Sequence, residues 1–343
     1  MGEERVAERT TTLAEIAAEA GVSVPTVSRV LNGKRGISET KRTQIEKLLD
    51  ERGYERRKPR RDISLIDFVI SGLDTQWATE LLRGAQAEAA RAGADLVLTA
   101  TDGRPAGTPD WIERLMTRGT DGVVLVVSEL APSARDELSR LQVPVVLIDP
   151  LGTDTESFVT VSATDWAGGR DATDHLIALG HTRIGFITGR LVLECHQDRL
   201  DGYFSALGRA RITSDSDLVR EGDSLTSGGK KFGAELLDLP DRPTAIISGS
   251  DEQAYGVYLA ARERGIRIPE DLSIVGFDDV DLCQWVTPQL TTVRQPLAGM
   301  AAEATRLLLA LSRGDAIANP RVQLASELVI RDSTSGPPAR SKG

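Results

Sequence analysis

The alternation of apolar runs with amphipathic stretches beyond residue 62 limits the possible folds more than any other feature of this sequence. Seven runs rich in Val, Ile and Leu recur there, and stretches with helical periodicity separate them. Uninterrupted apolar strands flanked by helices predict parallel sheets that are covered on both faces. We predict strands over residues 63–70, 94–100, 121–128, 143–149, 183–189, 244–249 and 272–278, and helices over 77–91, 132–141, 166–179, 197–210, 252–265 and 297–312.

This part of the chain is too long for one comfortable sheet, since domains typically hold about 100–150 residues. The sequence therefore predicts two successive α/β lobes after an N-terminal headpiece and a short basic linker. The polar, Pro- and Gly-containing C-terminus is predicted to be a disordered tail. The expected boundaries are 1–54 for the headpiece, 55–62 for the linker, 63–162 and 292–320 for the first lobe, 163–291 and 321–333 for the second lobe, and 334–343 for the tail.

Three short helices are indicated between residues 12 and 51. Thr12 and Glu15 have the spacing of a capping box, and Gly21 is placed to end the first helix. Ser23 and Ser38 stand where the second and third helices need N-cap residues. Two short helices joined by a tight glycine-containing turn predict a helix-turn-helix.

The net charge of −10 conceals an uneven distribution. Residues 1–61 carry 14 Lys and Arg against 10 Asp and Glu, whereas the rest of the chain carries 27 against 41. A weakly basic head on an acidic body indicates a DNA-binding module joined to a body that avoids DNA. The alternative is a solvated linker with incidental arginines.

Several classes of protein fit this sequence poorly. The composition, 40% hydrophobic and 27% charged, is that of a soluble globular protein. No apolar run approaches the roughly 18 residues that span a bilayer, and the N-terminus lacks a signal-like apolar segment. Cys195 and Cys283 have no CxxC spacing and only three His are present, so we expect no disulfide framework, metal or cofactor. We expect a cytoplasmic protein without a membrane partner.

Five strings, in this order and spacing, resemble the LacI/GalR family of bacterial transcriptional regulators. They are TLAEIAAEAGVSVPTVSRVLNG, HLIALGHTRIGFITG, RLDGY, PEDLSIVGFDDV and PQLTTVRQP, and the resemblance runs from about residue 12 to residue 332. It implies a helix-turn-helix headpiece followed by a two-lobed effector domain like the periplasmic sugar-binding proteins. It also implies a homodimer on double-stranded operator DNA. A small molecule in the cleft between the lobes would switch DNA affinity.

Matching VSVPTVSR to the VSxxTVSR pattern of the family places the specificity pair at Val24 and Pro25. Arg29 follows one turn later, where a guanidinium can bind a guanine with two hydrogen bonds. Short polar side chains nearby suit phosphate contacts, although they can also be solvated helix residues. With the Ser23 cap, the predicted headpiece contacts are Thr12, Ser23, Val24, Pro25, Thr26, Ser28, Arg29 and Asn32.

The linker departs from the family pattern. Most members follow the third helix with a segment that forms a hinge helix and wedges a leucine into the minor groove. Here GYERRKPRRDISLIDF is about five residues shorter and lacks that leucine, so the wedge is not carried over. We expect its basic residues to hold phosphates or a narrow minor groove; the alternative is a solubilising linker. These residues are Arg56, Arg57, Lys58, Arg60 and Arg61.

Two carboxylates stand at predicted strand ends, where parallel sheets bind ligands. Asp149 ends VPVVLID and Asp278 ends LSIVGFD, and each carboxylate can accept hydrogen bonds from sugar hydroxyls. The resemblance implies that Arg199, in RLDGY, points into the cleft. Alternatively, Asp278 and Asp279 form a helix cap and Arg199 lies on a helix surface.

The remaining effector candidates carry less information. Asp74 and Trp77 follow the first strand of the first lobe, and Trp166 begins a helix at the lobe boundary. Either indole can stack on the C–H face of a sugar or fill a core. Ser250 stands where many sugar-responsive members have Asn, which leaves the ligand's identity open. The resemblance adds Gln295, from the TTxxQ position. Cys195 is a candidate because it lies in the loop ahead of Arg199.

The predicted function is an effector-responsive repressor with a carbohydrate ligand. The same architecture with a purine or nucleoside ligand, or with activation in place of repression, stays open. A sugar-binding transport protein or a sugar-modifying α/β protein is the alternative from another class. We find no GxGxxG after a strand, no Walker loop and no nucleophile elbow, so the chain is not expected to be an enzyme. The tail lacks the leucine heptads of a tetramerisation helix, which favours a dimer.

Overall fold

The computed structural model describes residues 13–31, 37–52, 64–102, 108–126, 132–140, 142–150 and 158–338 of the 343-residue chain. The chain divides into two compact units, Met1–Asp62 and Ile63–Gly343. In the described part of the first unit lie three helices, α1 (Leu13–Ala20), α2 (Val24–Leu31) and α3 (Glu39–Glu51).

The helices of the first unit enclose a small apolar core. Ile16, Val27 and Ile45 contribute one fully buried side chain from each helix. Gly21 ends α1 with a φ of 63°, a left-handed conformation in which glycine is not strained. The backbone N–H of Val22 then donates to the carbonyl of Ala17 (3.0 Å), which closes the turn into α2. This arrangement is the predicted helix-turn-helix.

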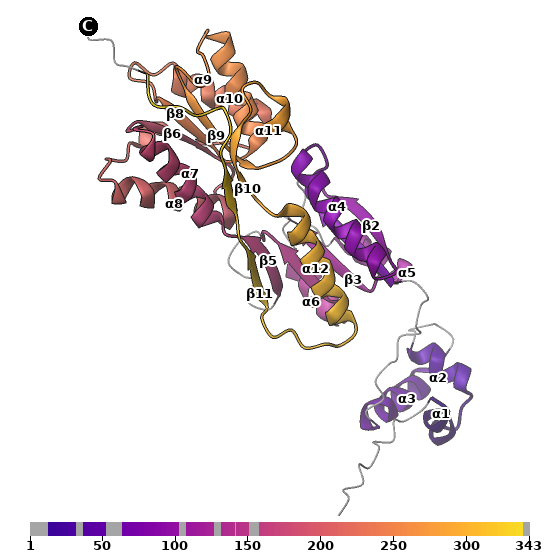
Figure 1. Ribbon diagram of the computed structural model, residues 1–343. Coiled ribbons are helices and arrows are strands. Elements are labelled where there is room, and N and C mark those ends of the chain that lie inside the picture. Colours follow the sequence, from indigo (N-terminus) through magenta and orange to yellow (C-terminus); the bar gives the residue numbers. More distant parts are fainter. Residues whose placement is uncertain are drawn as a thin grey trace, which may run out of the picture. The chain divides into compact units, whose positions relative to one another are not determined.

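The second unit consists of two lobes, each built around a six-stranded sheet (Figure 1). The strands of the first sheet are all parallel, and their spatial order is β11-β5-β4-β3-β1-β2. Their bounds are β1 (Ser64–Ile70), β2 (Ala94–Ala100), β3 (Gly122–Val126), β4 (Val145–Ile148), β5 (Val159–Ala163) and β11 (Arg321–Leu324).

Helices cover both faces of the first sheet. On one face α4 (Gln76–Arg91) and α12 (Leu297–Ser312) lie side by side (Figure 1). Phe68 of β1, with Leu81 and Met300 from these two helices, is fully buried in the core between them. On the opposite face, Trp111 and Leu138 from α5 (Pro109–Arg118) and α6 (Pro132–Arg140) pack against the sheet.

The second sheet follows the same plan, with the order β12-β10-β9-β8-β6-β7. All its pairs are parallel except β12 with β10, which is antiparallel. The strands are β6 (Ile184–Thr188), β7 (Val219–Glu221), β8 (Ala245–Ser248), β9 (Ser273–Asp278), β10 (Thr291–Arg294) and β12 (Glu327–Val329). The helices are α7 (Asp165–Ala178), α8 (Glu194–Arg209), α9 (Thr226–Leu237), α10 (Asp251–Glu263), the short α11 (Leu282–Trp285) and a 3₁₀ turn at Ser216–Leu218.

The chain crosses between the lobes after β5, after β10 and after β11 (Figure 1). The predicted lobe boundaries are therefore wrong at two places. All of β10 belongs to the second sheet, whereas the prediction ended the first segment of the second lobe at residue 291. Residues 321–324 form β11 in the first sheet, paired with β5, whereas the prediction assigned 321–333 to the second lobe. β11 is a short edge strand in which exposed residues alternate with half-buried ones, a pattern that does not indicate which sheet it joins.

The start of the predicted disordered tail is ordered, as is Ser333, the last residue before it. Ser333 is fully buried, and its hydroxyl donates to the carbonyl of Ile274 (2.6 Å) while accepting from the N–H of Thr291 (2.8 Å). The carbonyl of Ser335 accepts from the His181 ring (2.8 Å). Serine hydroxyls here pair with backbone groups of neighbouring strands, a role that polar composition cannot indicate. Residues 339–343 of the predicted tail lie outside the described residues.

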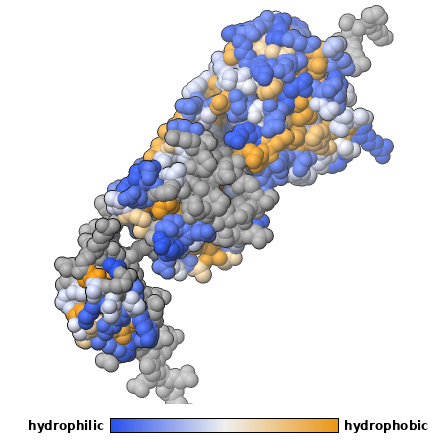
Figure 2. Space-filling view, turned by 180° about the vertical axis from the view of Figure 1, so that it is seen from behind, coloured by the Kyte–Doolittle hydropathy of each residue, from blue (hydrophilic) through white to orange (hydrophobic). Residues whose placement is uncertain are grey.

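The surface of the molecule is consistent with the burial of apolar residues in the cores of the lobes. Figure 2 shows a face on which hydrophilic residues cover most of the described surface, with hydrophobic residues confined to a few patches. Across the described residues, no helix is long and apolar enough to cross a membrane.

Candidate effector cavity

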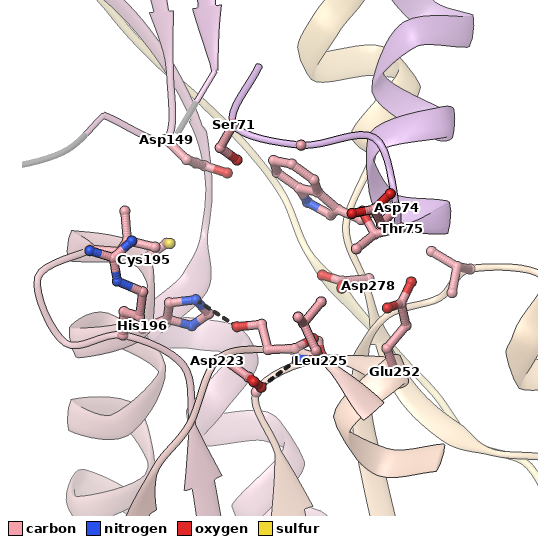
Figure 3. Close-up of a pocket in the computed structure, with 18 of the residues that line it drawn as sticks. Ser71, Asp74, Thr75, Asp149, Cys195, His196, Asp223, Leu225, Glu252 and Asp278 are labelled. Carbon is pink, nitrogen blue, oxygen red and sulfur yellow. Dashed lines mark hydrogen bonds between the residues drawn. The ribbon is translucent and has the colours of Figure 1, made fainter. Parts of the chain in front are cut away.

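A cavity of about 330 Å³ lies between the two lobes of the second unit (Figure 3). The first lobe lines it with the segment from Ser71 to Trp77, which links β1 to α4, and with Asp149 after β4. The second lobe contributes residues that follow β6, β7, β8 and β9. Parallel strands bring their carboxyl ends to one edge of a sheet, and the cavity lies where those edges of the two sheets face each other.

Arg199 is the buried cation of this cavity. It is 3% exposed, and its Nε donates to Oδ1 of Asp165 at 2.7 Å. Nη1 donates to the carbonyl of Gly249 (2.7 Å), and the guanidinium carbon lies 3.8 Å from the ring centroid of Phe277. Gly169 lets α7 approach α8 for this ion pair, since a Cβ there would lie 2.1 Å from the Arg199 carbonyl oxygen. The guanidinium is thus fixed by a carboxylate outside the cavity.

Asp149 is a buried acceptor without a partner. Its side chain faces the cavity (Figure 3), is 4% exposed, and its backbone φ is 44°. Oδ1 has no hydrogen-bond partner within the part of the chain that the structure describes. Burial, and then the charge of Asp165, raise the pKa of Asp149 to about 8. Such a carboxyl group is suited to a ligand that supplies a hydrogen-bond donor.

Asp278 lies at the end of β9 in a more fixed position. Its φ is 118° and that of Asp279 is 60°, so the chain turns sharply at the cavity. Nε2 of Gln295 donates to Oδ1 of Asp278 at 2.6 Å. Burial holds the pKa of Asp278 well above its usual range. Behind this turn, Oδ2 of Asp251 accepts from the N–H of Val280 (2.9 Å) and helps to hold the loop.

Small polar groups complete the wall of the second lobe. Nε2 of His196 lies 3.2 Å from the hydroxyl of Ser224, and Nδ1 of this ring is buried without a partner among the described residues. Burial, and then the charge of Arg199, lower the pKa of His196 to about 3, so the ring is neutral. Ser250 caps α10 by accepting from the N–H of Gln253 (3.1 Å).

The first residue of α4 joins the lobes beside the cavity. The backbone N–H of Gln76 donates to Oε1 of Glu252 (3.0 Å) in the second lobe. The N–H of Leu282, also in the second lobe, donates to Oε1 of Gln76 (3.0 Å). Asp74 and Trp77, on either side of Gln76, line the cavity. The segment that carries these two candidates is therefore attached to the opposite lobe.

The structure brings most of the predicted effector residues together. Seven of them line the cavity, namely Asp74, Trp77, Asp149, Cys195, Arg199, Ser250 and Asp278. Gln295 and Trp166 do not line it. Gln295 lies behind Asp278, and Trp166 is 39% exposed, with the Arg170 guanidinium 5.3 Å from its ring centroid. These two residues do not take the contact positions predicted for them.

Sequence reasoning missed several residues of the wall. Ser71, Glu252 and Val280 follow or flank strand ends, and Leu193 and Leu225 add apolar surface. Ser71 directly follows β1, so the rule that selected Asp149 and Asp278 at strand ends could also have predicted this residue. The others lie in helices or loops, and no local pattern marks them.

The headpiece candidates are described only in part. Ser23 and Val24 are exposed at the start of α2, Val24 by 42%, and the hydroxyl oxygen of Thr26 lies 2.9 Å from that of Ser23. Pro25, Ser28 and Arg29 lie in α2, but their side chains lie outside the described part of the structure. Thr12, Asn32, Arg56, Arg57, Lys58, Arg60 and Arg61 are outside the described residues altogether.

Comparison with known proteins identifies the family. Residues 12–57 match "Bacterial regulatory proteins, lacI family" and residues 173–334 match "Periplasmic binding protein-like domain". The HTH-type transcriptional repressor CytR of Escherichia coli (strain K12) is 33% identical over 336 residues, 96% of this chain and 98% of that protein.

Solved structures agree in fold. A complex of the transcriptional regulator CelR with cellobiose has a TM-score of 0.71 and 31% identity, and the match covers 94% of this chain and 99% of that one. The lac repressor dimer bound to operator and the anti-inducer ONPF has a TM-score of 0.70 and 26% identity, covering 95% and 100%. The predicted architecture, a helix-turn-helix headpiece with two parallel-sheet lobes, is confirmed. The chain belongs to the LacI family of DNA-binding transcriptional regulators.

Proposed function

We propose that this protein is a transcriptional repressor whose affinity for its operator is switched by a small carbohydrate in the cavity between the lobes. The observation that carries the proposal is that both lobes line one cavity, with Asp149 on the first lobe and Arg199 and Asp278 on the second. A ligand that contacts all three stabilises the closed arrangement of the lobes, because it makes its full set of contacts only there.

The headpiece reads the operator in this proposal. Val24, Pro25 and Arg29 contact base edges in the major groove, and Arg29 discriminates guanine by about 1–3 kcal/mol. Phosphate contacts come from Thr12, Ser23, Thr26, Ser28 and Asn32. The basic linker adds phosphate contacts through Arg56, Arg57, Lys58, Arg60 and Arg61. Replacing these five linker residues flattens the slope of log affinity against log salt, by about 0.9 for each phosphate that the protein no longer neutralises.

The assembly we propose is a homodimer on a two-fold operator, which follows the lac repressor dimer among the structural relatives. Closing the lobes changes the spacing of the two headpieces relative to half-sites one helical turn apart. A coupling of about 1–3 kcal/mol between ligand and operator gives roughly a 5–150-fold change in operator affinity. Operator DNA lies in the bacterial cytoplasm, where we place the protein.

A nucleoside is the second candidate effector. Trp77 lines the cavity, and an indole stacks on a base as readily as on the C–H face of a sugar. The apolar side chains of Leu193, Leu225 and Val280 add surface that suits either ligand.

The experiment is a titration of an operator complex. A duplex selected from genomic fragments by binding to the full chain is labelled, and its affinity is measured by fluorescence anisotropy with cellobiose, glucose, ribose, cytidine or adenosine. A ligand-dependent shift of at least fivefold supports the proposal. Absence of a shift with every ligand opposes it. Arg29→Ala serves as the DNA-contact control and abolishes selective binding.

The ligand acts by binding and is not transformed. CytR, one of the relatives, is named a transcriptional repressor, and we assign no catalytic step to the cavity of this chain. Proton NMR of each ligand after incubation with the protein distinguishes the two classes of function. An unchanged spectrum is expected, whereas turnover would point to a sugar-modifying enzyme.

A further inference from the structure

Two helices from opposite lobes cap each other beside the cavity. The backbone N–H of Gln76, the first residue of α4, donates to Oε1 of Glu252 in the second lobe (3.0 Å). Glu252 points toward Thr75, the residue before α4 (Figure 3). In return, Oε1 of Gln76 accepts from the N–H of Leu282, the first residue of α11 in the second lobe (3.0 Å). The first N–H groups of a helix have no partner within that helix, so each lobe supplies an acceptor that a helix of the other lobe needs.

An apolar contact accompanies this reciprocal capping. Val280, in the turn between β9 and α11, is 3% exposed and belongs to the buried apolar cluster of the first lobe, which also contains Leu297 of α12. Leu282 packs against the same cluster. The turn of the second lobe is thus anchored in the core of the first. We call these four residues the interlobe latch: Gln76, Glu252, Val280 and Leu282.

The latch contacts join protein groups only, so they favour the closed lobes with or without a ligand. Opening the lobes would leave both N–H groups to water and expose the side chain of Val280. Each hydrogen bond of this kind shifts the equilibrium between open and closed lobes by roughly 2–10-fold. Burial of the apolar side chain adds to this preference for closure.

We propose that the interlobe latch keeps the lobes mostly closed before an effector binds, and that the effector consequently releases the protein from its operator. This inference rests on the proposed function, because it gives the direction of the same switch. A chain of this kind binds operator through the open form, which is the minority form.

The direction follows from the populations of the two forms. Operator affinity without effector is the average over the open and closed forms, weighted by their populations. Suppose that the closed form binds DNA more tightly and already makes up more than half of the molecules. Complete closure then raises operator affinity by less than about twofold. A larger ligand-dependent change must therefore be a loss of operator binding, which requires the open form to be the one that binds DNA.

Spin labels on the full chain test the latch without any ligand. Gln86→Cys in α4 and Ser214→Cys in the second lobe place the labels at exposed positions of the two lobes. The native thiols react slowly, because burial raises the pKa of both Cys195 and Cys283. An excess of unlabelled chain keeps one labelled subunit in each dimer. Double electron–electron resonance then measures the distance between the labels, and we expect one main population while the latch is intact.

Latch variants should open the lobes and tighten operator binding. In Glu252→Ala and in Gln76→Ala, we expect the open population to rise by roughly 2–10-fold. Operator affinity without ligand, measured by fluorescence anisotropy, should rise by a similar factor. Glu252→Gln keeps the accepting oxygen and should stay closer to the chain with an intact latch. The matched control is Glu263→Ala, which removes an exposed carboxylate from the last residue of α10 and should change neither measurement. Gln76→Ala serves alone if Glu252→Ala does not fold.

The outcomes separate this inference from the proposed function. Distance distributions that do not change in the folded latch variants overturn the inference, and so does operator binding that is weaker or unchanged. A sugar or nucleoside that strengthens operator binding by about fivefold or more also overturns it, and leaves the effector role intact. Latch variants that behave as expected, in a chain whose operator affinity no ligand changes, support the latch and oppose the effector role.

Discussion

Replacing Asp165 with alanine should destabilise the second unit strongly although the residue does not line the cavity. Asp165 is 2% exposed and pairs with Arg199, itself 3% exposed, at 2.7 Å. Without this carboxylate, the buried guanidinium keeps, among the described residues, the Gly249 carbonyl as its hydrogen-bond acceptor and the Phe277 ring beside it. Breaking a buried ion pair from one side costs about 3–5 kcal/mol. For a unit of this size, that corresponds to a fall in melting temperature of about 6–20 °C.

Differential scanning calorimetry of the full chain measures this change. Asp165→Asn keeps an oxygen acceptor of the same shape and should lose less stability than Asp165→Ala. The control is Lys230→Ala, which removes an ion pair of similar length to Glu263 (2.6 Å) between two exposed side chains and should shift melting far less. Effector affinity should also fall in Asp165→Ala, because Arg199 loses the group that orients it. Melting of Asp165→Ala within about 1 °C of the wild type would refute this account of the pair.

Three other changes address the tail, the buried histidine and the link between the lobes. Ser333→Ala removes the hydroxyl that pairs with the N–H of Thr291 and the carbonyl of Ile274, so urea unfolding should show a loss of about 1–3 kcal/mol, and an unchanged midpoint would contradict the anchoring role of Ser333. His196 has a pKa of about 3 when folded and about 6.5 when unfolded. Below pH 6.5 the unfolded chain therefore takes up a proton that the folded chain does not, and the free energy of unfolding falls as the pH is lowered. Between pH 7 and pH 5, wild-type stability should therefore fall by about 2 kcal/mol more than that of His196→Asn, and parallel pH curves would exclude the effect. Gln76→Ala removes one of the two hydrogen bonds that this residue forms between the lobes and should speed amide exchange at Leu282, whereas Gln86→Ala, an exposed position on the same helix, should not.

The secondary structure was largely predictable because burial on both faces of a parallel sheet gives uninterrupted apolar runs. The seven predicted strands correspond to β1, β2, β3, β4, β6, β8 and β9, with ends that differ by two residues or fewer. Five strands were not among those predicted. β7, β11 and β12 are three or four residues long and lie at sheet edges, whereas β5 and β10 lie inside their sheets but are only five and four residues long. The predicted helices also leave out α5, α9 and the short α11. In α9 the interior glycines Gly228, Gly229 and Gly233 lower the helical signal in the sequence.

Among the cavity residues, the rule that ligands bind at strand ends identified Asp149 and Asp278. It could not tell which residues at the start of a helix point toward the cavity. Asp165 and Trp166 are neighbours at the start of α7, and successive helix residues point about 100° apart. Asp165 occupies the inward position against Arg199, so the Trp166 ring lies outside the cavity. Gln295 has the residue type expected of a ligand contact, yet its amide acts on Asp278. Distinguishing these roles requires the packing of α7 and β10.

The two carboxyl groups that an effector would bridge are held to different degrees, and this difference bears on how the proposed switch works. Asp278 already accepts from Gln295, whereas Oδ1 of Asp149 lacks a partner among the described residues. A hydrogen-bond donor on the ligand therefore removes a larger free-energy cost at Asp149, whose buried oxygen is unpaired, than at Asp278. Asp149 belongs to the first lobe and Arg199 to the second, so a ligand held by Arg199 reaches that oxygen only while the lobes are closed. Only contacts that differ between the open and closed states shift the equilibrium, and for this reason most of the coupling between effector and operator should depend on Asp149.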